Sequence, residues 1–202
     1  MIVNNDEVIY WNMLTEFLRR FVPIGDEELQ LWQPYFEIRH FKKRKLILHK
    51  GDVEKYINIV ASGLVRKFMK VKKGEVTLQI SPEGHMIHSE RSFHLQQPSE
   101  LVIETIEPTV LLSISYENLH ELYNRFPLAE KMGRIFATEM YIIKDKRYSD
   151  IVKKSTREIF LDYMKTHPEM LQRVPQKYIA SYLNIKPETF SRLKHLLKKK
   201  TH

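Results

Sequence analysis

Residues 174–197 constrain this chain more than any other stretch, because they predict two short helices joined by a tight turn. The first helix is expected to start at Pro175, whose fixed φ suits a first helical turn. Asn184 then tolerates the left-handed backbone conformation that such a turn requires. Pro187 is well suited to open the second helix. The apolar positions recur at helical spacing: Ile179, Ala180, Leu183, Ile185, Phe190, Leu193 and Leu197.

This pattern is that of a helix-turn-helix, in which the second helix enters the major groove of DNA. It combines a small residue at 180, a turn residue four positions later and apolar residues at 185, 190 and 193. An ordinary helical hairpin is the alternative, because amphipathic helix pairs are common. The stretch therefore predicts a DNA-reading element and leaves a purely structural one open.

The distribution of charge favours a polyanionic partner. The chain carries a net charge of +8, and residues 151–202, with 12 Lys/Arg and 4 Asp/Glu, hold all of it, since residues 1–150 contain 21 of each. Basic residues bind phosphates partly through the release of condensed counterions. Taken alone, the run Lys198, Lys199 and Lys200 is better explained as a solvated tail.

The chain contains no cysteine, which excludes disulfides, thiolate metal sites and cysteine-ligated iron–sulfur clusters. It also contains no secretory signal and no apolar run long enough to span a bilayer. A cytoplasmic protein that does not insert into membranes is expected.

Residues 36–115 predict a β-rich domain. They contain short runs rich in β-branched and aromatic residues: FEIRHF, KLILHKGD, YINIVASG, LVRKFMKVKKGE, VTLQISPEG, LVIETIEP and TVLLSIS. Many short strands with glycine or proline between them indicate a sandwich or barrel, and a hairpin turn is expected at Lys73-Gly74. Three glycines fall where tight bends would close a small β-roll: Gly51, Gly63 and Gly84. The polar segment 85–100 interrupts the strands, and ligands tend to bind at such interruptions.

Amphipathic helices are expected on both sides of these strands. Residues 7–20 and 26–34 precede them, and Ser115 is a candidate cap for a helix to about Asn124. A capping box at residues 155–158 starts a further helix through about Lys165, which His167-Pro168 then stops.

Pro127 is expected to open a long helix reaching about Tyr148. Apolar residues recur along it at three- and four-residue steps, which suits a partner helix. The predicted dimer contacts are Met132, Phe136, Met140 and Ile143. A helix-turn-helix that reads palindromic DNA normally needs two copies, which favours a homodimer. The alternative is that this stripe packs on the chain's own β-roll.

These elements predict an α+β fold in three parts. Residues 1–126 form a β-roll sensor-like domain with N-terminal helices, and residues 127–150 form a dimerisation and connecting helix. Residues 151–202 form an all-helical, helix-turn-helix DNA-binding domain.

In this order the elements resemble the cyclic-AMP receptor protein (Crp/Fnr) family of bacterial transcription regulators, over essentially the whole chain. The most specific likeness is in KLILHKGD followed by YINIVASGLVRKF, and in IASYLNIKPETFSRLKHLL. The stretch from SFHLQQPSE to LQRVPQKYIASYLNI is most similar to a subgroup of small regulators common in the Bacteroidetes. The resemblance implies a cyclic-nucleotide-binding fold, double-stranded DNA as a ligand and RNA polymerase as a partner.

The resemblance also implies roles for the second helix of the motif. Glu188 and Arg192 stand where the family has its base-reading Glu and Arg, and these side chains can pair with cytosine N4 and with guanine O6 and N7. The alternative for this pair is an intrahelical ion pair. A third family base contact falls at Pro187, which offers no donor. The other predicted DNA contacts, several of them to phosphates, are Lys177, Lys186, Thr189, Ser191 and His195.

In nucleotide-binding members of the family, a Gly-Glu pair and an Arg-Ser pair hold the ribose and the cyclic phosphate. Here His88-Ser89 and Ser99-Glu100 occupy the comparable places, and Glu100 would repel a phosphate. Arg91 is the nearest basic residue that could compensate. A different small effector, or none, is therefore expected.

Other functional classes are less favoured. The second hypothesis for the function is a ligand-binding β-roll module whose basic tail contacts a protein partner. An enzyme ranks third, because the sequence has no nucleophile elbow, phosphate-cradling glycine loop or HExxH motif. One histidine-rich set suggests a metal, but surface or hydrogen-bonded imidazoles explain it better: His85, His88, Glu90 and His94. No metal and no cofactor are expected.

Overall fold

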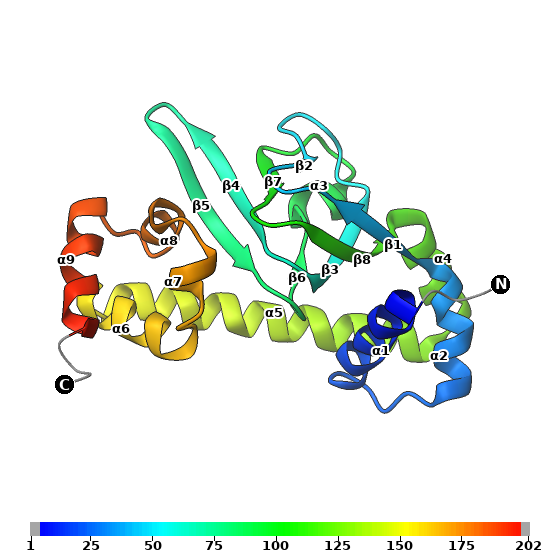
Figure 1. The fold of residues 1–202 in the computed structure, drawn as a ribbon. Coiled ribbons are helices and arrows are strands. Elements are labelled where there is room, and N and C mark those ends of the chain that lie inside the picture. The colour runs from blue at the N-terminus through cyan, green and yellow to red at the C-terminus, as the bar shows by residue number, and fades with distance from the viewer. Residues whose placement is uncertain (1–4, 199–202) are drawn as a thin grey trace.

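The computed structural model describes residues 5–198, which form a mixed α+β fold built along one long helix (Figure 1). The chain begins with α1 (Asn5–Arg19), α2 (Asp26–Trp32) and the 3-10 turn η1 (Gln33–Tyr35), close to the two predicted helices. The predicted α+β class is confirmed. Lys199 and Lys200 of the predicted basic tail lie outside the described residues.

Two four-stranded antiparallel sheets form the β-roll, with strand orders β1-β8-β3-β6 and β2-β7-β4-β5. The strands are β1 (Phe36–Phe41), β2 (Leu46–Leu48), β3 (Tyr56–Ser62), β4 (Val65–Val71), β5 (Gly74–Ser81), β6 (Met86–Ile87), β7 (Leu101–Thr105) and β8 (Thr109–Ser115). Apolar side chains from both sheets, among them Val60, Ile103 and Leu111, pack between them. The short helix α3 (Glu90–Leu95) lies within the predicted polar segment between β6 and β7.

Gly63 closes the β3–β4 turn, where only glycine fits. Its φ is +94°, and a Cβ at this position would lie 2.3 Å from the carbonyl oxygen of Pro108. This close approach brings the β3–β4 and β7–β8 turns together. At the other end of β4 the hairpin turn lies one residue earlier than predicted: Lys72 and Lys73 form the tip between β4 and β5, and Gly74 is the first residue of β5, paired with Val71.

The second half of the described chain is helical. Its elements are α4 (Tyr116–Arg125), α5 (Pro127–Lys153), α6 (Thr156–Thr166), α7 (Met170–Arg173), α8 (Gln176–Tyr182) and α9 (Pro187–Lys198). The Ser115 hydroxyl accepts a hydrogen bond from the Asn118 amide at 3.0 Å, and Ser155 and Glu158 form the predicted capping box. Helix α5 continues five residues past Tyr148, because nothing in the sequence between Tyr148 and Lys153 breaks a helix.

Besides the core between the two sheets, two apolar cores involve helices. One of these two joins the β-roll to the helices at the C-terminal end of the described chain. The first packs α1, α2, α4 and the start of α5 on the sheet that contains β1 and β8. The second lies among α6, α7, α8 and α9 and includes Leu64 and Ile106, which belong to the two turns beside Gly63. The helix-turn-helix region therefore shares its core with the β-roll. The division of the chain at residues 126 and 150 stays a prediction.

Candidate functional site

The turn between α8 and α9 has the geometry that the sequence predicts. Asn184 has a φ of +55°, and the amide of Ile185 donates to the carbonyl oxygen of Ala180 at 2.8 Å, which closes the end of α8. Ile185 and Ala180 are buried. The rings of Phe190 and Phe160 meet edge to face with centroids 5.2 Å apart, so α9 is held firmly on α6.

Helix α9 presents its polar side chains outward. Glu188 and Arg192 are exposed, and they form no ion pair with each other in the described structure, although intrahelical pairing was the alternative to base reading. Thr189 is half-buried. The remaining predicted DNA contacts are exposed: Lys177, Lys186, Ser191 and His195. These roles stay predictions, and the geometry is compatible with all of them.

The four residues of the predicted dimer stripe on α5 have different environments in the single chain, and their role in a dimer stays a prediction. Met132 is buried in the chain's own core, and the ring of Phe136 packs on Phe21 with centroids 5.4 Å apart. For these two residues the chain follows the alternative, packing on its own N-terminal helices and β-roll. Met140 is half-buried, and Ile143, on the same helical face, is exposed. Sequence periodicity alone does not reveal which of two apolar stripes faces inward.

A different face of α5 is apolar and uncovered. Its largest exposed side chains are Tyr141 (72% exposed) and Tyr148 (70%), and Val152 continues the same line. Steps of seven and four residues place these three side chains on one side of a helix. Ile142 also borders this face. The spacing is readable from the sequence, but the polar residues between these positions mask it.

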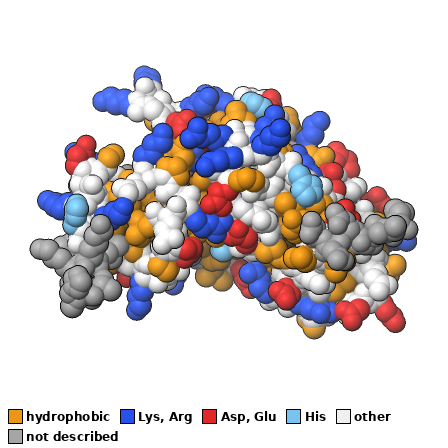
Figure 2. Space-filling view, in the orientation of Figure 1, with side chains coloured by type: hydrophobic (Ala, Val, Ile, Leu, Met, Phe, Trp, Pro, Cys, Tyr) orange, Lys and Arg blue, Asp and Glu red, His pale blue; other side chains and the backbone are white. Residues whose placement is uncertain are grey.

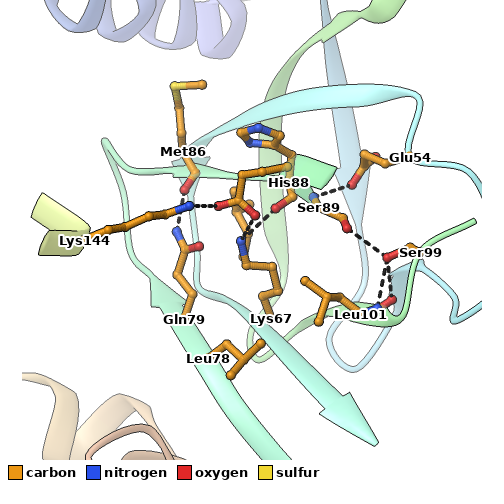
Figure 3. Close-up of polar contacts among 12 residues, drawn as sticks. Glu54, Lys67, Leu78, Gln79, Met86, His88, Ser89, Ser99, Leu101 and Lys144 are labelled. Atoms are coloured by element: carbon orange, nitrogen blue, oxygen red, sulfur yellow. Dashed lines mark hydrogen bonds and ion pairs between the residues drawn. The ribbon is translucent and has the colours of Figure 1, made fainter. Parts of the chain in front are cut away.

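The predicted effector residues divide into two groups. His88, Ser89 and Ser99 are buried, whereas Arg91 and Glu100 are exposed. The Ser99 hydroxyl donates to the Ser89 hydroxyl oxygen at 2.9 Å (Figure 3). Glu100, which was expected to repel a phosphate, is exposed to solvent, and this role stays a prediction.

Four further residues, Glu54, Lys67, Glu90 and Lys144, complete this region (Figure 3). The Ser89 amide donates to a Glu54 carboxylate oxygen at 3.2 Å. The Lys67 ammonium donates to the His88 carbonyl oxygen at 2.8 Å and to the Glu90 carboxylate at 2.7 Å. Lys144 reaches over from α5 and donates to the other oxygen of Glu90 at 3.0 Å. A carboxylate thus lies between two lysines where the β-roll meets the long helix.

The protonation states agree with this network. Burial alone would raise the pKa of the Glu90 carboxyl, but the neighbouring Lys67 ammonium outweighs it and lowers the pKa to about 2. Burial lowers the pKa of the Lys67 ammonium, and the Glu90 carboxylate opposes that shift. Burial also lowers the pKa of His88 to about 3, so its ring is neutral. An anionic ligand would have to displace Glu90 to contact Lys67.

Sequence reasoning missed Lys67 and Lys144 as parts of this site, because they come from β4 and α5, far from the segment 85–100. Glu90 was considered only as a metal ligand. Among residues 5–198, the described side chains include no group of three His, Asp or Glu residues that could hold a metal ion. None of the described helices is both long enough and apolar enough to cross a membrane.

Comparison with known proteins supports the assignment of the fold. Residues 38–126 match the family model for the cyclic nucleotide-binding domain. The catabolite activator protein of Thermus thermophilus is 23% identical, with a TM-score of 0.56 over 92% of this chain and 88% of that one. FixK2 from Bradyrhizobium japonicum is 18% identical, with a TM-score of 0.65 over 82% and 86%.

A third similar structure is the c-di-GMP-responsive global regulator CLP of Xanthomonas campestris, at 17% identity, with a TM-score of 0.63 over 88% of this chain and 93% of that one. No curated protein sequence matches the chain. These comparisons confirm a cyclic nucleotide-binding domain at residues 38–126 and a fold shared with the structures of these regulators. The narrower likeness to a Bacteroidetes subgroup stays a prediction.

Proposed function

We propose that this chain, which has the fold of the catabolite activator protein type of regulators, is a sequence-specific DNA-binding transcription regulator that binds a palindromic operator as a homodimer. The observation that carries the proposal is the α8–α9 unit, with its left-handed turn at Asn184 and with Glu188 and Arg192 exposed one turn apart on α9. RNA polymerase is the protein partner that such a regulator needs, and the proposed role is not enzymatic.

Selection of bound sites from random duplexes tests the DNA-binding role. The expected product is a two-fold symmetric sequence with half-sites about one helical turn apart, bound at least about a thousandfold more tightly than random DNA. Affinity should fall steeply with salt, because phosphate contacts release counterions. Binding without sequence preference, or none at low salt, would contradict the proposal.

For the dimer we propose an interface on the uncovered face of α5, formed by Tyr141, Tyr148 and Val152. An apolar stripe of this kind on a long helix is stable in water when a second helix covers it. Two copies joined there would each present one α9. This interface replaces the stripe of Met132 and Phe136, which pack within their own chain.

For the sensor we propose that cyclic AMP and cyclic GMP bind weakly or not at all. The Glu90 carboxylate already pairs with Lys67 and Lys144, and a cyclic phosphate would compete with an internal anion for the same cations. Titration calorimetry of the wild type should give no heat of binding at micromolar nucleotide. Micromolar affinity would show that Glu90 moves aside readily.

A second candidate function is that of a ligand-binding module whose basic C-terminal part contacts a protein. The match of residues 38–126 to a cyclic nucleotide-binding domain favours it. The same DNA selection separates the two functions. Only the regulator is expected to enrich a symmetric duplex sequence.

A further inference from the structure

We infer that the tip of the β4–β5 hairpin is a second DNA contact, in which Lys72 and Lys73 bind the phosphate backbone beside the groove that α9 enters. This inference rests on the proposed function, because it adds a surface to the same DNA complex. It concerns a part of the β-roll that the helix-turn-helix motif does not include.

The hairpin is fastened to α8, so its tip keeps a fixed position relative to the reading helix. The amide of Thr77 on β5 donates to the Ser181 hydroxyl on α8 at 2.9 Å. Arg147 of α5 donates to the carbonyl oxygens of Leu78 and Tyr182, both at 3.0 Å, and its guanidinium lies 3.9 Å from the Tyr182 ring centroid. Three elements are therefore joined at one point.

A buried arginine makes the second attachment. Arg66 on β4 is 3% exposed, and its guanidinium lies 3.7 Å from the ring centroid of Tyr178 in the first turn of α8. The same guanidinium pairs with Glu104 at 2.7 Å and with Glu75 at 2.9 Å. Lys177, a predicted phosphate contact, is the neighbour of Tyr178 and is exposed.

The tip itself carries unpaired positive charge. Lys70, Lys72 and Lys73 are exposed, and within the part of the chain that the structure describes they take part in no ion pair. The one acidic residue of the tip, Glu75, is engaged by Arg66. Figure 2 shows Lys and Arg side chains gathered where the hairpin projects, at the end of the molecule where Figure 1 draws α9.

The reach of the hairpin suits a backbone contact. Thr77 bonds to α8, and Lys73 lies four residues before it, so the tip extends about 13 Å past that bond at about 3.3 Å per strand residue. The major groove is about 12 Å wide. The distance from α8 to the tip is therefore comparable to the width of the groove, so the tip can reach the phosphate backbone at the border of the groove.

Protection of an edge strand is the other explanation for lysines in a hairpin. Strand β5 is indeed the last strand of its sheet. However, α8 already covers its free side, since Ser181 takes the Thr77 amide that a foreign strand would need. Lysines at the tip are thus not required to block pairing along this edge.

The test uses the full-length protein and the operator obtained by selection. Lys72→Ala/Lys73→Ala is compared with Lys72→Arg/Lys73→Arg, which keeps the charge. Lys50→Ala/Lys55→Ala is the matched control, because both lysines are exposed in the loop between β2 and β3 and the loss of charge is the same. Affinity is measured for operator and random duplex across a salt series, and each complex is footprinted with hydroxyl radicals.

We expect the double alanine variant to lose about fivefold in affinity per lysine at 0.15 M salt, and its salt slope to become shallower by about 0.9 per lysine. The loss should be equal for operator and random DNA, and protection should disappear at phosphates outside those affected by Lys177→Ala. The arginine variant should bind as the wild type does.

A loss no larger than that of the Lys50/Lys55 control would overturn the inference and leave the regulator role intact. Normal DNA binding with reduced transcription would also overturn it, by assigning the tip to a protein partner such as RNA polymerase. A wild-type protein that fails to bind any duplex would defeat the proposed function itself, and this inference with it.

Discussion

Arg192 is exposed on α9 and, within the described structure, forms no ion pair with Glu188, although such a pair is common on a solvated helix face. Arg192→Ala is expected to cost about 1–3 kcal/mol on the preferred site, because a bidentate contact to guanine is worth about that much. Selectivity should relax at one base pair in each half-site. Competition binding with operator variants measures both effects.

Lys177→Ala is the control for this prediction. It removes a phosphate contact, so it should weaken operator and random DNA alike and make the salt dependence shallower. If Arg192→Ala gave the same uniform loss, Arg192 would not be a base-reading residue.

His88 makes the stability of the β-roll depend on pH. Its pKa falls from an ordinary 6.5 to about 3 in the folded protein, because burial penalises the charged ring. A depressed pKa gives stability that is present above pH 6.5 and is lost as the pH falls toward 3. Between pH 7 and 5 the free energy of unfolding should drop by about 2 kcal/mol through this residue.

Urea unfolding at both pH values tests this prediction with two variants. His88→Gln cannot take up a proton in this range, so its loss between pH 7 and 5 should be smaller than that of the wild type by about the same 2 kcal/mol. His85→Gln, at an exposed position three residues away, should follow the wild type. Equal slopes for all three proteins would mean that His88 reaches solvent when it is protonated.

The residues that could be predicted from sequence are those whose roles are local. Asn184, Ser115 and the Ser155–Glu158 capping box each depend on a few neighbouring residues, and each has the expected geometry. The Glu90 site was not predictable in this way. It needs Lys67 and Lys144 from distant elements, and no spacing in the sequence brings the three together.

At the level of elements, α5 shows where periodicity stops being sufficient. The helix and its start at Pro127 were predicted, but two apolar stripes run along it and both fit helical spacing. Packing decides between them: the stripe of Met132 and Phe136 meets α1 and the roll, and the stripe of Tyr141 and Tyr148 is left outside. The sequence predicted the helix but not which of its two apolar faces packs inward.

Tyr141→Asp is therefore expected to give monomers with poor operator affinity. The side chain is 72% exposed in the single chain, so the change should leave the fold intact while placing a charge in the proposed interface. Ile143→Asp is the matched control, since Ile143 is also exposed but lies roughly 160° away around the helix. Sedimentation at micromolar concentration compares both variants with the wild type. A dimer that persisted in Tyr141→Asp and dissociated in Ile143→Asp would favour the stripe predicted from sequence.

At the scale of the whole molecule, one arginine ties the helix-turn-helix region to the β-roll. Arg173 at the end of α7 pairs with Glu83 and with Glu107, both at 2.8 Å, and donates to the Gly63 carbonyl oxygen at 3.2 Å. Burial would raise the pKa of Glu83, but the hydrogen bonds from Arg173 and from backbone amides, among them that of Gly63, together with the charge of Arg173, outweigh this effect and lower it. Together with Leu64 and Ile106 in the shared core, these bonds predict that the two regions unfold as one unit.

Arg173→Ala is expected to uncouple the unfolding of the helix-turn-helix region from that of the β-roll. It leaves two carboxylates facing each other at a half-buried site, which is expected to cost about 1–3 kcal/mol, and the cost falls on the contact between the regions and not on either core. Calorimetry should then resolve two transitions in place of one.

Arg157→Ala is the control, because Arg157 is an exposed arginine on α6 and makes none of these bonds to the β-roll. A double-mutant cycle with Glu83→Gln isolates the pair, since neutralising Glu83 relieves repulsion in the alanine variant. If the single transition persisted in Arg173→Ala, the shared apolar core alone would couple the regions and the ion pairs would only set their orientation.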